Sequence, residues 1–561
     1  MNARLNPIAA RFNAPAVSVL GVLTLSLHGG ALRGGWRFDD PMILKYVTEL
    51  PLAAFFFSPA EMKSFGIVSF TPWLFLDYWV NFGLFGLDAT GFYAHNLVAV
   101  WAAAALTFLL LRPFAGPFWG FVAAALFLLG APTAVVSQQL MSRHYADGLV
   151  FAILAIQLHL HANESNSTLR KYLSGGCYLL ALLNKEIFLP LPFVLFFLSQ
   201  GAMARRLLAV GPFILIAAAY GGWRAVMLSQ WVGGYTGGFD QIMSMPASLF
   251  TLTGLFFGNG WPAAMGAALT GVAAIVLWIR VRRALPVVLA ALAALALPFA
   301  AVTASSDVLH LRYALLPWWA WCLLCSLSLA SLSRANSEPS IGARHPVRNR
   351  VITGALAVMV FIVPAVVGRE ASIAHETKAA EFDVQGAFLW QHDHHLGYVP
   401  YGAVAVWASF QYSISDLKQR FRGATTPVVV PFVESASLFH VGPVQTYEPR
   451  CRCMKTIAAA AIPTDAPDSS YDPAMPMSVW LDRSANGLRW RLDPLDASCF
   501  LVFSKRSFSV SIPCTGAVGY ALPQDMHGPF RFLARMEKGV WGTSPLLTFP
   551  QEGQTVEWRR H

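Results

Sequence analysis

The stretch AVSVLGVLTLSLHGGALRGGWRFDDP (residues 16–41) decides the class of fold. It opens with an apolar run long enough to approach the roughly 20 residues that cross a bilayer core. Arg4 and Arg11 precede the run, but no small-x-small cleavage site follows it, so we expect a retained membrane span rather than a signal peptide. The stretch ends in a polar turn with two adjacent carboxylates, Asp39 and Asp40.

Apolar runs of similar length recur along the first two thirds of the chain. Of its 561 residues, 56% are hydrophobic and only 12% are charged, which is typical of a polytopic membrane protein with a smaller soluble part. We predict about eleven transmembrane helices, at residues 16–33, 90–111, 117–137, 146–162, 172–184, 187–200, 207–226, 262–279, 285–303, 311–332 and 351–367. The predicted fold class is a polytopic α-helical membrane protein with a C-terminal, mainly β domain.

The basic residues set the predicted orientation. The net charge of +10 needs no nucleic acid partner, because Lys and Arg collect in the cytoplasmic loops of membrane proteins. With a cytoplasmic N-terminus, the clusters on that side are Arg112; Arg170 and Lys171; Arg205 and Arg206; Arg280, Arg282 and Arg283; and Arg334, Arg344, Arg348 and Arg350. Arg33, Arg37 and Lys45 fall on the other side and count against this orientation. An odd number of spans in a bacterial inner membrane then puts the tail in the periplasm.

Two parts are predicted. Residues 1–367 form a transmembrane catalytic domain, whose first outer loop, residues 34–90, is rich in aromatic side chains and suits helices lying in the membrane interface. Residues 368–561 form a soluble periplasmic domain. In this tail, alternating stretches such as VAVWASFQYSI (residues 404–414) and FRFLARM (residues 530–536) predict short strands.

The cysteine and histidine residues of the tail point to disulfides rather than to a metal. Cys451, Cys453, Cys499 and Cys514 lie in the part predicted to be exported, which favours one or two disulfides, with three full pairings open. The loop QHDHHLGY (residues 391–398) carries metal-binding groups, but zinc sites need spaced ligands. We therefore expect a solvated loop there.

Ionisable side chains near the predicted outer membrane face are the candidates for chemistry, because such groups are costly at membrane depth and usually functional. They form an acidic pair and three mixed clusters on one side of the membrane, where His95 is a further supporting group. The members are Asp39 and Asp40; Arg143, His144 and Asp147; Lys185 and Glu186; and Asp307, His310, Arg312 and Tyr313. A local salt bridge is the simpler interpretation of Arg143 and Asp147, which are four residues apart.

Glycosyl transfer outside the cytoplasm needs the residue types found in these clusters. Nucleotide sugars are absent there, so the donor is a sugar carried by a membrane lipid, usually a polyprenyl phosphate. The departing phosphate needs a cation, and Arg binds phosphate best through paired donors. The acceptor hydroxyl needs a carboxylate base, for which Asp39 or Asp40 is available. The candidate phosphate ligands are Arg312, Tyr313, Lys185 and Arg143.

The same stretches resemble the type C glycosyltransferase superfamily (GT-C), which includes protein O-mannosyltransferases and the aminoarabinose transferases that modify lipid A. Like this chain, its members carry an acidic pair in the first outer loop. Further matching stretches are FTPWLFLDYWVNFGLFGLDATGFYAHNLV (residues 70–98), similar to Y-R-P-L … N … L-F-G-L … G-F-H … N; SRHYADGL (142–149), similar to R-x-x-x-D/E-L; NKE (184–186), similar to a Lys-Glu turn; and LRYALLP (311–317), similar to R-Y-x-x-x-P. The likeness spans about residues 16–330.

The resemblance implies a GT-C fold with its base in the acidic element, and it leaves open which carboxylate that is. We expect Asp39 to be the base and Asp40 to orient the acceptor or a metal. Some members of the superfamily use a divalent cation, and Asp39, Asp40 and Asp147 would suit Mg²⁺ or Mn²⁺, so metal dependence stays open. Thr71 stands where the pattern has Arg, and a contact made by that Arg is therefore absent or moved.

These observations together predict an inverting glycosyltransferase. It moves a hexose or pentose from a polyprenyl-phosphate donor to a hydroxyl of a glycan, lipid or protein acceptor on the periplasmic face. The first alternative is a transporter or flippase for a lipid-linked sugar, which would need charges near the bilayer midplane and interrupted helices in two related halves. The second is a membrane-anchored, glycan-binding assembly protein, which would leave the charged clusters unexplained.

Overall fold

The computed structural model describes most of the chain. The described residues are 13–64, 69–165, 167–229, 256–257, 260–280, 308–337, 346–399, 404–429, 443–457, 478–484, 487–493, 499–505, 508–514, 518–521, 530–535, 541–543, 551 and 554–558. The predicted span at residues 285–303 and the candidate Asp307 lie outside them. The chain divides into two compact units: the first comprises Met1–Gly34 and Val68–Glu376, and the second comprises Gly35–Ile67 and Thr377–His561.

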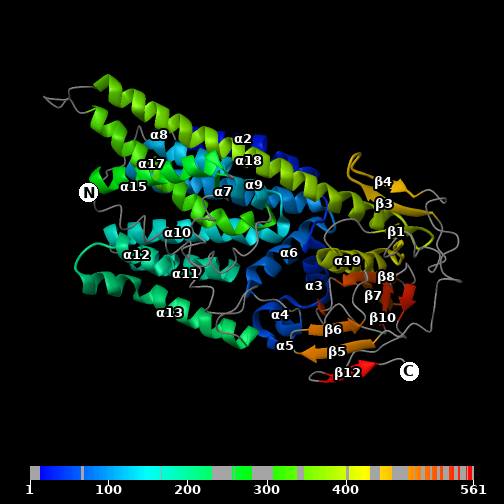
Figure 1. Ribbon diagram of the computed structural model, residues 1–561. Coiled ribbons are helices and arrows are strands. Elements are labelled where there is room, and N and C mark those ends of the chain that lie inside the picture. Colours follow the sequence, from blue (N-terminus) through cyan, green and yellow to red (C-terminus); the bar gives the residue numbers. More distant parts are fainter. Residues whose placement is uncertain are drawn as a thin grey trace. The chain divides into compact units, whose positions relative to one another are not determined.

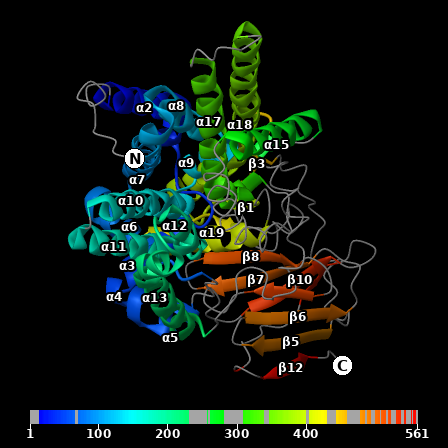
Figure 2. The ribbon, with the colours of Figure 1, turned by 90° about the vertical axis from the view of Figure 1, so that its left-hand side faces the viewer.

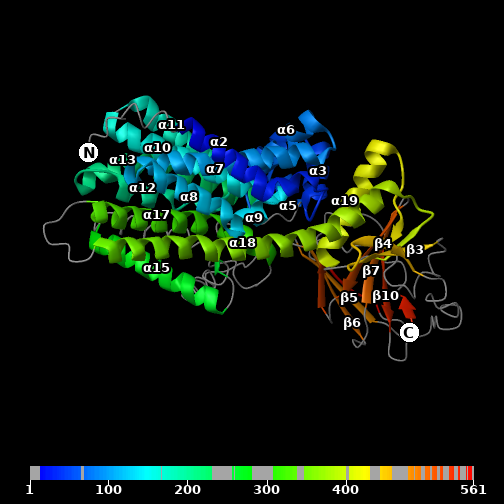
Figure 3. The ribbon, with the colours of Figure 1, turned by 90° about the horizontal axis from the view of Figure 1, so that it is seen from above.

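The first unit is a bundle of helices (Figure 1). Its elements are α2 (Asn13–His28), η1 (Gly29–Arg33), α6 (Pro72–Phe85), α7 (Ala89–Ala115), α8 (Pro117–Leu129), α9 (Ala131–Ser137), η2 (Leu140–Ser142), α10 (Arg143–Ser165), α11 (Thr168–Asn184), η3 (Glu186–Phe188), α12 (Leu191–Leu198), α13 (Met203–Leu228), α15 (Trp261–Arg280), η5 (Val308–Ala314), α17 (Leu315–Ser337) and α18 (Pro346–Gln391) up to Glu376. Helix α10 packs against α7 and α11, and α17 packs against α8 and α15 (Figure 3).

Helices occupy ten of the eleven predicted spans, and the eleventh lies outside the described residues. Within the described residues, six helices are long and apolar enough to cross a membrane, and the bent pair α8 and α9 would make a seventh. The six are Asn13–Arg33, Ala89–Ala115, Leu140–Ser165, Met203–Leu228, Leu311–Arg334 and Gly354–Gln391. The remaining predicted spans coincide with α11 and with two shorter apolar helices, Glu186–Leu198 and Pro262–Leu277. The polytopic helical fold class is confirmed.

The break between α8 and α9 bends the chain by 62°, and side-chain packing explains it. Pro132 has no N–H with which to continue the hydrogen-bond ladder of α8. The Phe127 carbonyl at the end of α8 instead accepts from the Trp318 indole at 3.1 Å and from the Thr133 hydroxyl at 2.6 Å. A Cβ atom at Gly130 would overlap the Trp318 ring, so only glycine allows α17 to approach this closely.

In its described residues, the second unit combines helices with three four-stranded sheets. Its helices are α3 (Asp40–Glu49), α4 (Leu52–Phe57), α5 (Pro59–Ser64), the end of α18 and α19 (Val404–Arg422). The first sheet has the order β2-β1-β3-β4, with β1 parallel to β2 and β3 and with β3 antiparallel to β4. The other two, β11-β10-β7-β8 and β12-β5-β6-β9, are antiparallel (Figure 2).

The strands confirm the mainly β character predicted for the tail, with one correction. They are β1 (Gly397–Val399), β2 (Val428–Val429), β3 (Val444–Glu448), β4 (Cys453–Thr456), β5 (Ser478–Ser484), β6 (Gly487–Asp493), β7 (Cys499–Lys505), β8 (Phe508–Cys514), β9 (Val518–Ala521), β10 (Phe530–Arg535), β11 (Trp541–Thr543) and β12 (Thr555–Trp558). The stretch at residues 404–414 is helical, as part of α19, and was wrongly predicted as a strand. Its residues 410–415 are buried without alternation, and a short apolar run does not distinguish helix from strand.

Two boundaries differ from the predicted layout. Residue 367, the predicted end of the membrane domain, lies inside the continuous helix α18. The predicted outer loop at residues 34–90 is divided, because α3 to α5 belong to the second unit and α6 belongs to the first.

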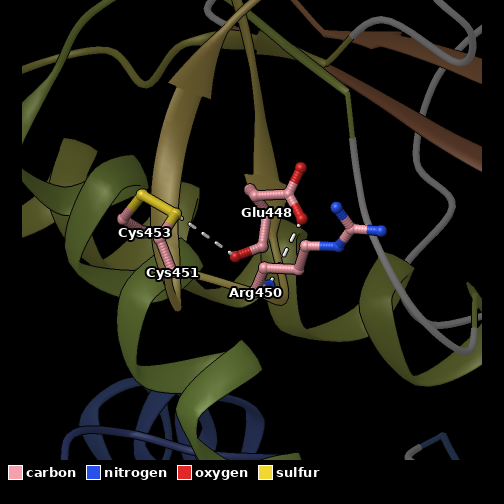
Figure 4. Close-up of a disulfide and its surroundings, with 4 residues drawn as sticks. All are labelled: Glu448, Arg450, Cys451 and Cys453. Atoms are coloured by element: carbon pink, nitrogen blue, oxygen red, sulfur yellow. Dashed lines mark hydrogen bonds between the residues drawn. A yellow bond between two sulfur atoms is a disulfide. The ribbon is translucent and has the colours of Figure 1, made fainter.

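A disulfide joins Cys451 to Cys453 at the turn between β3 and β4 (Figure 4). In the same turn, the Arg450 N–H donates to the Glu448 carboxylate at 3.2 Å. One predicted disulfide is therefore present, between residues only two positions apart.

Candidate functional site

The segment before the acidic pair is held tightly within the second unit. Arg37 donates from Nε and Nη2 to the two carboxylate oxygens of Asp383 on α18, at 2.8 and 2.6 Å, and the Gly35 N–H donates to the same side chain at 3.0 Å. Phe38 has a φ of 49°, which is uncommon for a residue with a side chain, and its ring lies 4.4 Å from that of Phe382. Such conformations persist where surrounding contacts determine them, often at active sites.

Asp39 and Asp40 follow this segment and differ in their surroundings. Asp40 is fully buried, begins α3 and accepts a hydrogen bond from the Arg37 N–H at 3.0 Å. Asp39 is half-buried and is the N-cap residue of α3, although its side chain caps none of the described N–H groups of that helix. Asp40 is thus committed to the turn, whereas solvent reaches Asp39. Which of the two carboxylates acts as the base stays a prediction.

Arg143 lies between two carboxylates in the first unit. Its Nη2 is 2.7 Å from Asp77 Oδ1 on α6, and its Nε is 3.1 Å from Asp147 Oδ2, one turn along α10. The local salt bridge is therefore present. Because Arg143 already has two carboxylate partners, it is less suited to a phosphate than the sequence suggested.

The surroundings of Asp77 are polar and buried. His95 Nδ1 lies 3.9 Å from Asp77 Oδ1 and makes a 2.9 Å hydrogen bond with Asn81 Oδ1. Burial raises the pKa of Asp77; the Arg143 guanidinium opposes this shift and the Asp147 carboxylate adds to it. One guanidinium thus serves two carboxylates, and the supporting candidates His95 and Asp147 belong to this cluster.

Lys185 and Glu186 occupy the turn after α11, and their partners differ. Glu186 Oε1 accepts from Arg224 Nε at 3.2 Å and from the Phe70 N–H at 2.7 Å. Lys185 Nζ donates to the Ser69 hydroxyl at 2.7 Å and lies 3.9 Å from Glu186 Oε2. Glu186 is thus engaged mainly by Arg224 and Phe70, which leaves the ammonium of Lys185 only weakly neutralised by it.

Two cations converge on a pair of tyrosine rings. Tyr145 on α10 and Tyr313 in η5 meet edge to face, with their centroids 5.8 Å apart. Lys185 Nζ lies 5.8 Å from the centroid of Tyr145, and Arg312 Cζ lies 4.8 Å from that of Tyr313. The buried ring of His144 lies against Tyr145, 4.5 Å between centroids. We call these five residues the tyrosine centre; it brings together the predicted candidates from three separate stretches of sequence.

The structure adds residues to the candidate site that the sequence reasoning did not single out. Asp77 and Asn81 are polar groups one turn apart on the aromatic-rich α6. Arg224 is a charge inside a predicted span, and charged groups in membrane segments are usually functional. Gln139 and His375 contact each other at 2.9 Å across 236 residues of sequence, a pairing for which the sequence carries no local signal.

Metal dependence was left open, and the groups that could hold a metal have other contacts in the described residues. Asp147 accepts from Arg143, and a carboxylate bound to arginine is a poor ligand for a cation. Asp39 and Asp40 belong to the other unit. In the loop predicted to be solvated, Asp393, His394 and His395 hold their ligand atoms within 4.8 Å of one another, and all three residues are exposed. Asp393 also accepts from the His395 N–H at 3.1 Å, an ordinary turn contact.

Known proteins are only distantly similar to this chain. No family model and no curated protein matches the sequence. Among solved structures, ArnT from Cupriavidus metallidurans bound to undecaprenyl phosphate is 12% identical with a TM-score of 0.42, over 80% of this chain and 99% of that one. The oligosaccharyltransferase of Archaeoglobus fulgidus, tethered with an acceptor peptide containing the NVT sequon, is 11% identical with a TM-score of 0.42, over 92% of this chain and 74% of that one. At these values neither likeness decides the activity of this chain.

Proposed function

We propose that this protein is a membrane glycosyltransferase that moves a sugar from a polyprenyl-phosphate donor to an acceptor hydroxyl. The observation that carries the proposal is the tyrosine centre, where Lys185 and Arg312 converge on one aromatic pair. A phosphate held between an ammonium and a guanidinium is stabilised by charge-assisted hydrogen bonds. The tyrosine rings beside them exclude water and strengthen those bonds.

Charge compensation supports Lys185 as a phosphate ligand. Its side chain is only 11% exposed, so its charge is partly removed from water. Its hydrogen bond goes to the neutral Ser69 hydroxyl, and the nearest oxygen of Glu186 is 3.9 Å away. A phosphate would add a second anion beside this ammonium. Arg312 donates to the amide oxygen of Gln139 at 3.5 Å and to the hydroxyl of Tyr313 at 3.2 Å.

In the proposed reaction Asp39 is the general base. It takes the proton of the acceptor hydroxyl as the hydroxyl oxygen attacks the anomeric carbon of the sugar. The bond between that carbon and the phosphate oxygen breaks, and the polyprenyl phosphate leaves with the electron pair and with its charge stabilised by Arg312 and Lys185. One displacement inverts the configuration of the sugar. Asp40 orients the acceptor or a metal, and the contacts of Arg143 with Asp77 and Asp147 join α10 to α6.

We propose that the reaction takes place on the periplasmic side of a bacterial inner membrane. The charge distribution supports this, because the basic loops favour a cytoplasmic N-terminus, with the acidic pair and the tail on the opposite side. We propose that the tail shapes the acceptor site, and that the acceptor is a glycan, a lipid or a protein. The donor sugar is a hexose or a pentose.

Binding of undecaprenyl phosphate to the full-length protein in lipid nanodiscs tests the proposed phosphate site. We expect Lys185→Gln and Arg312→Gln each to raise the Kd about tenfold or more, because each removes one charge-assisted contact. Arg334→Gln is the matched control, since Arg334 donates to the Phe114 carbonyl at the other end of α17. Unchanged affinity in both test variants would contradict the proposal. Movement of an intact lipid-linked sugar between leaflets, without release of the lipid phosphate, would instead support a flippase.

A further inference from the structure

A buried chain of hydrogen bonds runs from Arg312 to helix α18. Arg312 Nη1 donates to Gln139 Oε1 at 3.5 Å, and Gln139 Nε2 lies 2.9 Å from His375 Nε2. His375 Nδ1 lies 3.0 Å from Gln138 Oε1. Gln138 Nε2 then donates to the Ser372 hydroxyl at 2.9 Å, and this hydroxyl donates to Glu376 Oε1 at 3.2 Å. The side chains of Gln138, Gln139 and His375 are buried.

The chemistry of Arg312 determines where every proton in this chain lies. A guanidinium only donates, so the group of Gln139 that faces it is the oxygen. The Ser142 hydroxyl also donates to that oxygen, at 2.6 Å. The NH₂ of Gln139 therefore faces His375, whose Nε2 has to accept.

The remaining protons follow in the same way. If Nε2 of His375 accepts, the proton of the neutral ring is on Nδ1, which donates to the oxygen of Gln138. The NH₂ of Gln138 then faces Ser372, and the hydroxyl proton of Ser372 goes to Glu376. All five bonds donate in one direction, from a cation at one end to a carboxylate at the other. Bonds aligned in this way polarise one another.

We propose that this chain positions Arg312 for the donor phosphate, with neutral His375 in its Nδ1–H form as the central positioning residue. The proposal rests on the proposed function. Arg carries its N–H donors in a rigid planar fork, so holding one edge through Gln139 aims the other edge. His375 itself touches neither the donor nor the acceptor.

The measurement that tests this proposal is which ring nitrogen of His375 carries the proton. A merely structural role for His375 does not require either nitrogen in particular. The ¹⁵N resonances of the full-length protein, labelled at histidine and reconstituted in lipid, identify which ring nitrogen carries the proton. The resonance pair lost in His375→Gln assigns the residue. We expect protonation at Nδ1 alone. A proton at Nε2, or at both nitrogens, would overturn the proposed chain whatever the protein binds.

Affinity for undecaprenyl phosphate tests the positioning role with matched variants. His375→Phe removes both bonds of the ring, and we expect the Kd to rise about tenfold. In His375→Gln the amide can accept from Gln139 and donate to Gln138, so the Kd should stay within about threefold of the wild type. His159→Phe is the control, because this buried histidine is not part of the chain; among the described residues it bonds to Ser199 at 2.9 Å.

The outcomes separate the two proposals. If wild-type protein binds undecaprenyl phosphate and Arg312→Gln weakens the binding, but His375→Phe binds as the wild type does, the positioning role is wrong and the proposed function stands. If the wild type does not bind this lipid at all, the proposed function is contradicted, and so is a positioning role for phosphate. Loss of binding in His375→Phe with rescue in His375→Gln supports both.

Discussion

At the scale of residues, Arg143 and Arg312 differ in the contacts that the described residues make with them. Arg143 has two carboxylate partners within 3.1 Å, whereas Arg312 contacts the amide oxygen of Gln139 and the hydroxyl of Tyr313. The first arrangement engages the guanidinium with two carboxylates, whereas the second places a guanidinium in the tyrosine centre with Lys185. Both arginines were candidates from the sequence, and only their tertiary contacts distinguish them.

Arg143 is therefore expected to matter mainly for stability. Arg143→Gln leaves Asp77 and Asp147 facing each other without a cation, and breaking a buried ion pair in this way costs roughly 3–5 kcal/mol. We expect a clearly lowered Tm for the purified variant. Asp77→Asn should be tolerated far better, because Arg143 keeps Asp147 and a neutral side chain is already favoured at this position by burial. Equal Tm values for the two variants would contradict this account.

The pH dependence of stability gives a second measurement on the same pair. Burial raises the pKa of Asp77 above its unfolded value. At pH values between the unfolded and the folded pKa, the folded state therefore binds a proton that the unfolded state has lost. Stability contributed by this group therefore falls as pH rises above about 4, the usual value for Asp. The Tm of the wild type should fall as the pH rises above about 4, and the Tm of Asp77→Asn should fall less over the same pH range.

At the scale of elements, two glycines permit the close contacts that form the bend between α8 and α9. A Cβ at Gly130 would overlap the Trp318 ring, and one at Gly368 on α18 would overlap the Leu129 carbonyl oxygen. Backbone cannot move aside as a side-chain end can. The bend leads from α9 directly into Gln138 and Gln139, so its geometry also affects the chain that reaches Arg312.

Substitution of Gly368 tests this packing. Gly368→Ala should destabilise the protein by about 1–3 kcal/mol, the usual range for overpacking a core, and should lower the Tm. Gly211→Ala in α13 is the matched control, because a Cβ there meets no atom of the described residues within 4 Å and alanine favours a helix by up to about 1 kcal/mol. A Gly368→Ala variant as stable as Gly211→Ala would show that the contact is not as close as described.

Much of the helical architecture could be predicted from the sequence, because each apolar run of membrane length has to satisfy its backbone internally and so forms a helix. The bend at Gly130, the continuity of α18 past residue 367 and the helical state of residues 404–414 could not. These depend on contacts such as Trp318 with Phe127, made between residues 191 positions apart. The conformation of short apolar runs and the positions at which helices bend or end depend on such tertiary contacts rather than on the local sequence pattern.

The candidate site was predictable in its composition and less so in its connections. Lys185, Arg312 and Tyr313 were identified from position and charge, and the structure groups them with Tyr145. Asp77, Gln139 and His375 act through partners far away in the sequence, so no local motif marks them.

At the scale of the whole molecule, the proposed base and the proposed phosphate ligands belong to different compact units. Asp39 is in the unit formed by Gly35–Ile67 and Thr377–His561, and Lys185 and Arg312 are in the other. On the proposed function, binding of the lipid phosphate and transfer of the sugar should therefore be separable by mutation, because the proposal assigns phosphate binding to the tyrosine centre and assigns proton removal to Asp39.

Turnover by the reconstituted full-length protein is the most direct test of the central claim. The substrate is a sugar linked to undecaprenyl phosphate, supplied with a membrane extract as the source of acceptors, and the readout is release of undecaprenyl phosphate together with sugar transferred to the acceptor fraction. We predict that Asp39→Asn lowers turnover about 100-fold or more, the usual contribution of a general base, while the Kd for undecaprenyl phosphate stays within about twofold. Full turnover by Asp39→Asn would contradict the account.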